Sequence, residues 1–235
     1  MIIVRPSSAR GRTRLDWLDS RHTFSFGGYF DPQFVGFRSL RVINDDRVKP
    51  GGGFGTHPHR DMEILSLVLD GALEHRDSLG HGSVIRKDDV QRMTAGTGVS
   101  HSEFNPSATD PVHFLQIWIL PERPGLTPGY EQKTFPEADR RNALRLVASR
   151  DGSGGSLTVH RDVAVLLGHL DAGGSLAFPT APGRHAWVHV FRGHIAVNGT
   201  MLVAGDGAAS SDEASLEVKA PDTEGDAGFL IFDLA

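Results

Sequence analysis

Two short motifs constrain the possible folds of this chain more than any other feature of its sequence. The first is His57-Pro-His59 and the second, further along the chain, is His101-Ser-Glu103. Side chains two positions apart on a β-strand point to the same face, so each motif presents a pair of metal-type ligands on one side. The pairs can meet at one ion only if both segments are strands and the chain between them folds back.

The segment between the motifs has the pattern of short strands separated by turns. Residues 63–69 are apolar, Asp70-Gly71 is typical of a β-hairpin, and residues 78–82 and 87–89 indicate further reversals. We therefore expect an antiparallel meander that brings the two motifs together.

Three imidazoles and one carboxylate form a ligand set that suits a single divalent transition metal. Iron(II) is the first candidate, and manganese, nickel, copper and zinc are the alternatives. Glycines precede both motifs and let backbone and substrate come close, which distinguishes this pattern from histidines that merely lie on a surface.

These residues resemble a known family. Gly51, His57, His59 and Glu63 have the spacing of the first cupin motif, and Gly98, His101 and Asn105 resemble the end of the second. The sharper similarity is to the pirin family, in particular to bacterial members described as quercetin 2,3-dioxygenases. It rests on residues 54–63, 71–78, 94–103 and 116–118, and it extends from His22 to Leu234.

The resemblance implies an all-β bicupin with two antiparallel β-barrel domains of jelly-roll type. We expect a metal-binding cupin domain at residues 1–135 and a degenerate cupin domain without a metal site at residues 136–235. By the pirin pattern the metal ligands are His57, His59, His101 and Glu103. Cupins in general more often use the glutamate of the first motif, here Glu63, so the fourth ligand depends on which pattern applies.

The resemblance also implies an activity. A flavonol and dioxygen would meet at the metal, the heterocyclic ring would be cleaved, and carbon monoxide would be released. Glu103 would be both a ligand and the catalytic base for the flavonol hydroxyl. Phe54 and Gln116 are candidates for the substrate pocket, as are Phe24 and Phe26, although aromatic residues are more often simply part of a core.

Two other functions fit the same residues. One is a non-catalytic, metal-dependent module that binds partner proteins and senses redox state, as some pirins are described. The other is a structural metal ion that stabilises the fold and has all of its coordination positions filled by protein ligands.

The composition favours an all-β chain with many tight turns, because 28 of its 235 residues are glycine and 13 are proline. There is no cysteine, which excludes disulfides, thiolate nucleophiles and iron–sulfur clusters.

The net charge of −5 gives no indication of nucleic-acid binding, and Arg10–Arg14 is more typical of a solvated loop than of a binding arm. No run approaches a membrane span and no signal segment is evident, so the cytoplasm is expected.

The second half carries a faint repeat of the first. Setting Gly193 on Gly71 aligns residues 188–197 with the strand before Gly71 and its return, and residues 205–207 then correspond to residues 87–89. The ligand positions fall on residues that cannot replace the ligands: Pro179, Ala181, Lys219 and Pro221. His185 and His189 are therefore expected to be structural.

Several local expectations complete the sequence analysis. Residues 15–18 are compatible with one helical turn, and residues 136–143 with a short helix. Residues 22–30, 37–43 and 112–120 have strand patterns. In the last strand, Gln116 is polar among apolar neighbours and needs a hydrogen-bond partner, for which a backbone group is the first candidate.

Overall fold

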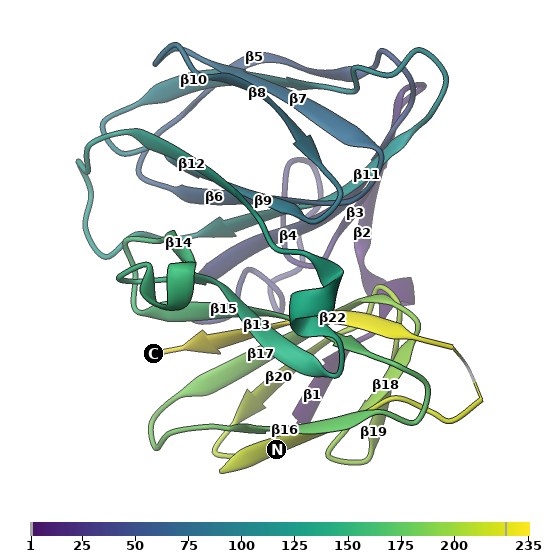
Figure 1. Cartoon of the computed structure of the whole chain (residues 1–235). Coiled ribbons are helices and arrows are strands. Elements are labelled where there is room, and N and C mark those ends of the chain that lie inside the picture. Colours follow the sequence, from purple (N-terminus) through teal and green to yellow (C-terminus); the bar gives the residue numbers. More distant parts are fainter. Residues whose placement is uncertain (1, 224) are drawn as a thin grey trace. The chain divides into compact units, whose positions relative to one another are not determined.

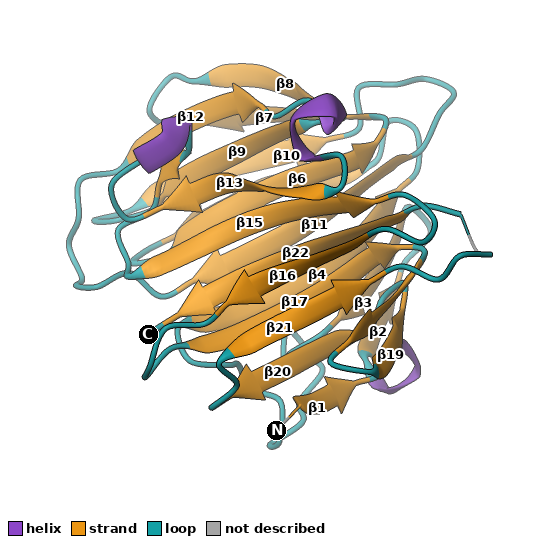
Figure 2. Ribbon diagram, turned by 60° about the horizontal axis from the view of Figure 1, so that its bottom comes forward, coloured by secondary structure: helices purple, strands orange, loops and turns teal. Residues whose placement is uncertain are grey.

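The computed structural model describes residues 2–223 and 225–235, and almost all of its regular structure is β-strand (Figures 1 and 2). The helical segments are single turns of 3-10 helix, such as Glu137–Arg140, which lies within the predicted short helix at residues 136–143. Within the described ranges, no helix has the length and apolar character needed to cross a membrane.

The chain forms two compact units. Residues 11–135 and 157–161 form one, which we call the histidine unit; residues 2–10, 136–156 and 162–235 of the described chain form the other, the C-terminal unit. The predicted break after residue 135 is also where the main segment of the histidine unit ends. The first residues differ from the prediction, because β1 (Ile2–Arg5) pairs with β20 (Gly207–Ser211) of the C-terminal unit.

The histidine unit consists of two antiparallel sheets (Figure 1). The larger sheet has the order β12-β9-β6-β11-β4-β3-β2, and the smaller has the order β5-β10-β7-β8. Their strands are β2 (Gly11–Arg14), β3 (Leu18–His22), β4 (Leu40–Val48), β5 (Gly53–His59), β6 (Glu63–Asp70), β7 (Ala72–Asp77), β8 (Gly82–Arg86), β9 (Asp89–Thr94), β10 (Val99–Phe104), β11 (Val112–Ile119) and β12 (Gly129–Thr134).

Apolar side chains from both sheets fill the space between them. Leu73 and Ile85 come from the smaller sheet, whereas Val68 and Phe114 come from the larger one, and all four are buried in one cluster. The unit is therefore a sandwich with a shared core. The all-β prediction is confirmed, but the two sheets remain separate instead of closing into a continuous barrel.

The predicted meander between the two motifs is wrong. Asp70-Gly71 does not make a hairpin, because β6 and β7 belong to different sheets. Gly71 has a φ of +77°, and a Cβ there would lie 2.7 Å from the carbonyl oxygen of Pro111, so the chain turns a tight corner beside another strand. As a result β5 pairs directly with β10, which brings the two motifs side by side.

Three local predictions also need correction. Residues 15–18 are not helical; reciprocal backbone hydrogen bonds between Leu15 and Leu18 close the β2–β3 hairpin. The strand expected at residues 22–30 ends at His22, and the chain continues as a loop in which the Ser25 hydroxyl donates to the carbonyl oxygen of Asp31. The strand expected at residues 37–43 begins at Leu40 and runs on to Val48. The strand predicted at residues 112–120 is confirmed as β11.

The C-terminal unit repeats this arrangement. Within this unit, one sheet has the strand order β1-β20-β17-β22-β15-β13 and the other has the order β16-β21-β18-β19, and both sheets contribute to an apolar core. Gly193 has a φ of +67° and separates β17 from β18 of the other sheet, as Gly71 separates β6 from β7. The strands are β13 (Ala143–Ser149), β15 (Val163–Leu170), β16 (Ser175–Pro179), β17 (His185–Arg192), β18 (His194–Val197), β19 (Thr200–Val203), β21 (Ser215–Lys219) and β22 (Ala227–Leu234).

Candidate metal centre

The pairing of β5 with β10 positions the two sequence motifs. His57 lies opposite His101, and His59 lies opposite Val99. The register shifts between His101 and Glu103, where a bulge interrupts the ladder. The strand period of two keeps each pair on one face, and the antiparallel register places the two pairs against each other.

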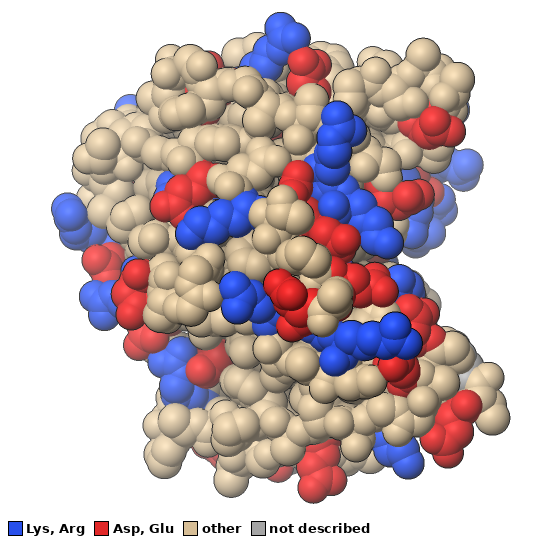
Figure 3. Space-filling model, viewed as in Figure 1, with Lys and Arg blue, Asp and Glu red and all other residues tan. Residues whose placement is uncertain are grey.

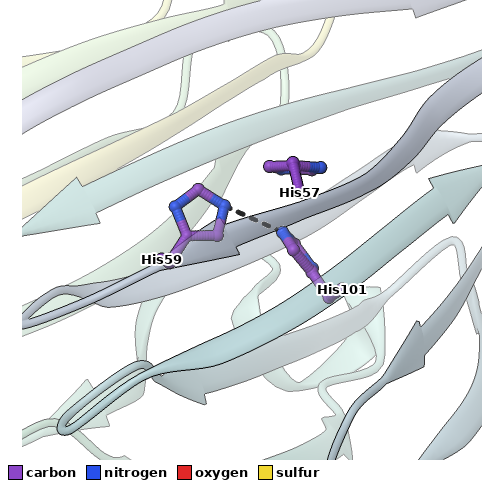
Figure 4. Close-up of side chains that lie close together, drawn as sticks. All are labelled: His57, His59 and His101. Carbon is purple, nitrogen blue, oxygen red and sulfur yellow. Dashed lines mark hydrogen bonds between the residues drawn. The ribbon is translucent and has the colours of Figure 1, made fainter.

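The three histidine rings converge on one point (Figure 4). Ring centroids are 4.7 Å apart for His57 and His59, 4.5 Å for His57 and His101, and 4.8 Å for His59 and His101. Each ring offers a nitrogen within 4.8 Å of a nitrogen of both others. The Nε2 atoms of His59 and His101 are only 3.0 Å apart.

Burial keeps two of these imidazoles neutral. It lowers the pKa of His59 to about 4, with a further contribution from His57. Burial likewise lowers the pKa of His101 to about 2, assisted by the charges of His57 and His59. Neutral imidazole is the form that binds a metal ion, because a protonated ring has no free lone pair.

The hydrogen bonds of the cluster fit a cation. The Nδ1 atom of His57 lies 2.7 Å from the carbonyl oxygen of Gly55, so it carries the proton and its Nε2 lone pair is free. Where His59 and His101 face each other, one nitrogen must donate a proton to the other unless a cation accepts both lone pairs. Imidazole nitrogens are ordinary ligands of zinc, copper, iron and nickel.

Glu103 lies next to this cluster in a fully buried position. Its Oε2 accepts a hydrogen bond of 2.7 Å from Gln116 Nε2, and its Oε1 accepts one of 3.3 Å from the Ser66 hydroxyl. Burial raises the pKa of the Glu103 carboxyl, while Gln116, His57 and Ser66 oppose the increase. The partners of Gln116 are thus the side chains of Ser66 and Glu103, and not the backbone group expected from the sequence.

The alternative carboxylate, Glu63, is engaged elsewhere. Its Oε2 accepts from the Thr94 hydroxyl at 2.9 Å, and its Oε1 lies 3.2 Å from Nδ1 of His160. Among the described residues, the groupings of ligand atoms that include His101 contain Glu103 and His75 but not Glu63. Glu103 therefore lies with His101 in such a grouping, whereas Glu63 has hydrogen-bond partners of its own.

A cavity of about 360 Å³ opens onto the histidines. Phe54 and Gln116, the two residues expected to line a pocket, both line it, as does Phe26. Phe24 does not; it is buried in the core. The walls are aromatic: Trp118 packs edge-on against His59 and Phe26, and Trp17 packs edge-on against Phe54.

The structure adds an acidic residue to the cavity that the sequence analysis missed. Asp46 on β4 lines the cavity together with Glu103, is 3% exposed, and has an Oδ1 atom without a hydrogen-bond partner among the described residues. Burial raises the pKa of Asp46 to about 7, even though Ser20 hydrogen bonds to the same carboxyl group. A signal was present in the sequence, because Asn44 and Asp46 interrupt one face of the strand that is otherwise formed by Leu40, Val42 and Val48.

A second group of ligand-type side chains lies in the C-terminal unit. Glu137, His169 and Asp226 approach one another in the C-terminal unit, but Arg192 already supplies a cation there, 2.8 Å from both His169 Nδ1 and Asp226 Oδ2. His185 hydrogen bonds to Ser211, and His189 is buried.

In the Arg10–Arg14 segment, Arg12 pairs with Asp19 at 2.8 Å across the β2–β3 hairpin. On the face shown in Figure 3, positive and negative side chains are interspersed, and neither sign forms a continuous field.

Two sheet sandwiches in one chain, of which one carries a histidine cluster and a cavity, define a bicupin protein with a candidate metal centre. Residues 4–119 match the family model for pirin, and residues 146–234 match the model for the quercetinase C-terminal cupin domain. The chain is 45% identical over 234 residues to the Escherichia coli (strain K12) protein named quercetin 2,3-dioxygenase, and the match covers 100% of this chain and 99% of that protein. The chain therefore belongs to the pirin family, as its motifs predicted.

Solved structures of a relative support the same assignment. The crystal structure of YhhW from Escherichia coli is 45% identical, covers 100% of this chain and 98% of its own, and has a TM-score of 0.95. A second structure, described as bacterial pirin YhhW in complex with nickel(II), has 45% identity, covers 100% and 99% of the two chains, and has a TM-score of 0.94. The bicupin fold is confirmed by these neighbours.

Proposed function

We propose that this protein is a metal-dependent dioxygenase that opens the heterocyclic ring of a flavonol and releases carbon monoxide. The observation that carries the proposal is the cavity, whose lining combines aromatic side chains with His57, His59 and Glu103. Its volume of about 360 Å³ lies in the range of roughly 300 to 1,000 Å³ typical of small-molecule sites. Relatives named quercetin 2,3-dioxygenase support the substrate class.

His57, His59, His101 and Glu103 would hold a single divalent transition metal. Three imidazoles and a carboxylate suit nickel(II) and iron(II), and nickel(II) is the ion named for the YhhW complex. When bound, such an ion supplies Lewis-acid and one-electron chemistry that protein side chains lack.

The chain's own residues would bind and activate the flavonol. Trp118, Phe26 and Phe54 offer flat apolar surfaces for its aromatic rings and exclude water. The buried carboxylate of Glu103 accepts the proton of the reacting hydroxyl, since burial raises its pKa and makes it a stronger base. Gln116 and Ser66 hold Glu103 in place through hydrogen bonds to its two oxygens.

Asp46 would recognise a second hydroxyl group of the substrate. Asp46 lines the cavity, and its buried Oδ1 atom has no hydrogen-bond partner among the described residues, so this oxygen is a candidate acceptor for a phenolic O–H. Asp46→Asn should therefore raise KM for quercetin, while leaving KM unchanged for 3-hydroxyflavone, whose single hydroxyl is the reacting one. An equal rise for both compounds would contradict this role.

The cavity also bears on the two alternative functions. A structural metal requires closed coordination, whereas here a cavity reaches the cluster. A non-catalytic module that senses redox state through partner proteins has no need of an aromatic cavity beside the histidines. Such a module remains the second hypothesis, and it predicts stoichiometric metal binding without turnover.

The test is reconstitution of the metal-free protein with nickel(II), iron(II), manganese(II), copper(II) or zinc(II), followed by quercetin consumption and carbon monoxide detection under air. We expect turnover with at least one ion. His59→Ala should lose both metal and turnover, and His185→Asn, in the C-terminal unit, is the matched control that should keep both. Stoichiometric metal without turnover under any ion would refute the dioxygenase and support the binding module.

A further inference from the structure

A chain of hydrogen bonds runs from the histidine cluster toward the protein surface through residues that the proposed function does not use. His101 Nδ1 lies 3.4 Å from Nδ1 of His75, and His75 Nε2 lies 3.3 Å from Oδ2 of Asp77. The side chains of His75 and Asp77 are both fully inaccessible to solvent. His81, whose Nδ1 lies 3.1 Å from Asp77 Oδ2, is the partly exposed end of the chain.

Asp77 acts only as an acceptor in this chain. Its Oδ1 accepts hydrogen bonds from the backbone N–H groups of Leu79, at 2.9 Å, and His81, at 3.0 Å, so the turn after β7 fixes the orientation of the carboxylate. Because a carboxylate has no proton to donate, His75 must carry its proton on Nε2.

The position of the proton on His75 in turn determines the tautomer of His101. A neutral His75 protonated on Nε2 has a bare Nδ1, which can only accept, so the proton between the two rings belongs to Nδ1 of His101. His101 then presents an unprotonated Nε2, the atom that faces His59 at 3.0 Å. Two hydrogen bonds thus determine which nitrogen of His101 is free to bind an ion.

We propose that Asp77 and His75 are positioning residues, which set the tautomer and ring orientation of His101 for metal binding. The proposal rests on the proposed metal site of the histidine unit and extends it to two residues that would not touch the ion. Carboxylate or carbonyl partners of metal-binding histidines act in this way in other proteins, where their loss lowers metal affinity by about 10- to 100-fold.

The first test measures the nickel(II) dissociation constant of the full-length metal-free protein by competition with a chelating dye. Asp77→Asn places an amide N–H where His75 needs an acceptor, so we expect affinity to fall by about 10- to 100-fold. His75→Leu, which cannot accept from His101, should have the same effect. His75→Gln should retain affinity within about threefold of wild type, because its amide can accept from His101 and donate to Asp77.

The matched control is His81→Asn, which removes a solvent-side partner of Asp77 but leaves the path from Asp77 to His101 intact. We expect its nickel(II) affinity to match that of the wild type. Wild-type affinity in Asp77→Asn and His75→Leu would overturn the proposal. Equal losses in His75→Gln and His75→Leu would also overturn it, since ring packing would then explain the effect.

A second measurement needs no variant and no metal. Nitrogen-15 NMR of the histidine side chains in the metal-free wild type distinguishes the two neutral tautomers. The proposal requires a protonated Nδ1 in His101 and a protonated Nε2 in His75, and the reverse assignment would overturn it. If the wild type instead binds none of nickel(II), iron(II), manganese(II), copper(II) and zinc(II), the proposed function fails, whereas the tautomer measurement still decides the positioning role.

Discussion

Replacing Asp46 with asparagine should make the metal-free protein more stable at high pH and change the pH dependence of its unfolding. Asp46 is 3% exposed, and one of its carboxyl oxygens has no hydrogen-bond partner among the described residues. Burial raises its pKa from 3.8 to about 7, and the negative charges of Asp45 and Glu103 contribute to the increase. At a pH between these two values, Asp46 is therefore protonated in the native state and ionised in the unfolded chain.

The direction of the effect follows from proton linkage. Between pH 4 and pH 7 the native state binds one more proton at Asp46 than the unfolded state, so the free energy of unfolding falls as the pH rises. A pKa increase from 3.8 to about 7 corresponds to about 4 kcal/mol, at about 1.4 kcal/mol for each unit. Above pH 7 the carboxylate is ionised in both states and the full penalty is present.

Urea unfolding of the metal-free wild type and of Asp46→Asn, at pH 4 and at pH 8, measures this effect. Relative to the wild type, we expect the variant to gain about 4 kcal/mol of unfolding free energy between the two pH values. The control is Asp70→Asn, which replaces an exposed carboxylate at the end of β6. Relative to the wild type, its unfolding free energy should change by less than about 0.5 kcal/mol between the two pH values. Parallel pH dependences for the wild type and Asp46→Asn would refute the reasoning.

Three further perturbations test the site and the fold. Nickel(II) at 100 times its dissociation constant should raise the unfolding free energy by about 2.7 kcal/mol, and His59→Ala should abolish the increase; an undiminished shift in the variant would place the metal elsewhere. Gly96→Ala should cost at least about 2 kcal/mol in urea unfolding, because Gly96 has a φ of +45° and a Cβ would overlap the carbonyl oxygen of Leu126. Gly55→Ala, which meets no atom within 4 Å, is the control, and equal losses would contradict the argument. Trp118→Ala should raise KM for quercetin several-fold by removing an aromatic wall of the cavity, and an unchanged KM would exclude the cavity as the substrate site.

Local patterns predicted much of the fold, because they depend on backbone geometry that a few residues control. Alternation and apolar runs identified β6 and β11, and the turn residue Gly193 marked the repeat of the first half in the second. Local patterns failed to predict whether the two strands that a turn connects pair with each other. The Asp70-Gly71 pair is a turn, but the sequence does not show that the strands on its two sides enter different sheets.

The candidate site, like the fold, could be predicted from the sequence only in part. The two-residue period of a strand places His57 and His59 on the same face of their strand, and it does the same for His101 and Glu103. The sequence alone therefore determined both pairs. The family resemblance selected Glu103 over Glu63 as the fourth ligand, and that choice stays a prediction; in the structure Glu63 hydrogen bonds to Thr94 and His160.

Only the tertiary structure decided how these pairs are used. The register of β5 against β10 depends on the packing of two whole sheets, and no local rule specifies it. The same packing brings His75 and Asp77 to His101, and it buries Asp46 beside the cavity without a partner for one of its oxygens. Strand periodicity determines on which face a side chain lies, whereas its partners, its exposure to water and its pKa depend on residues that are distant in the sequence.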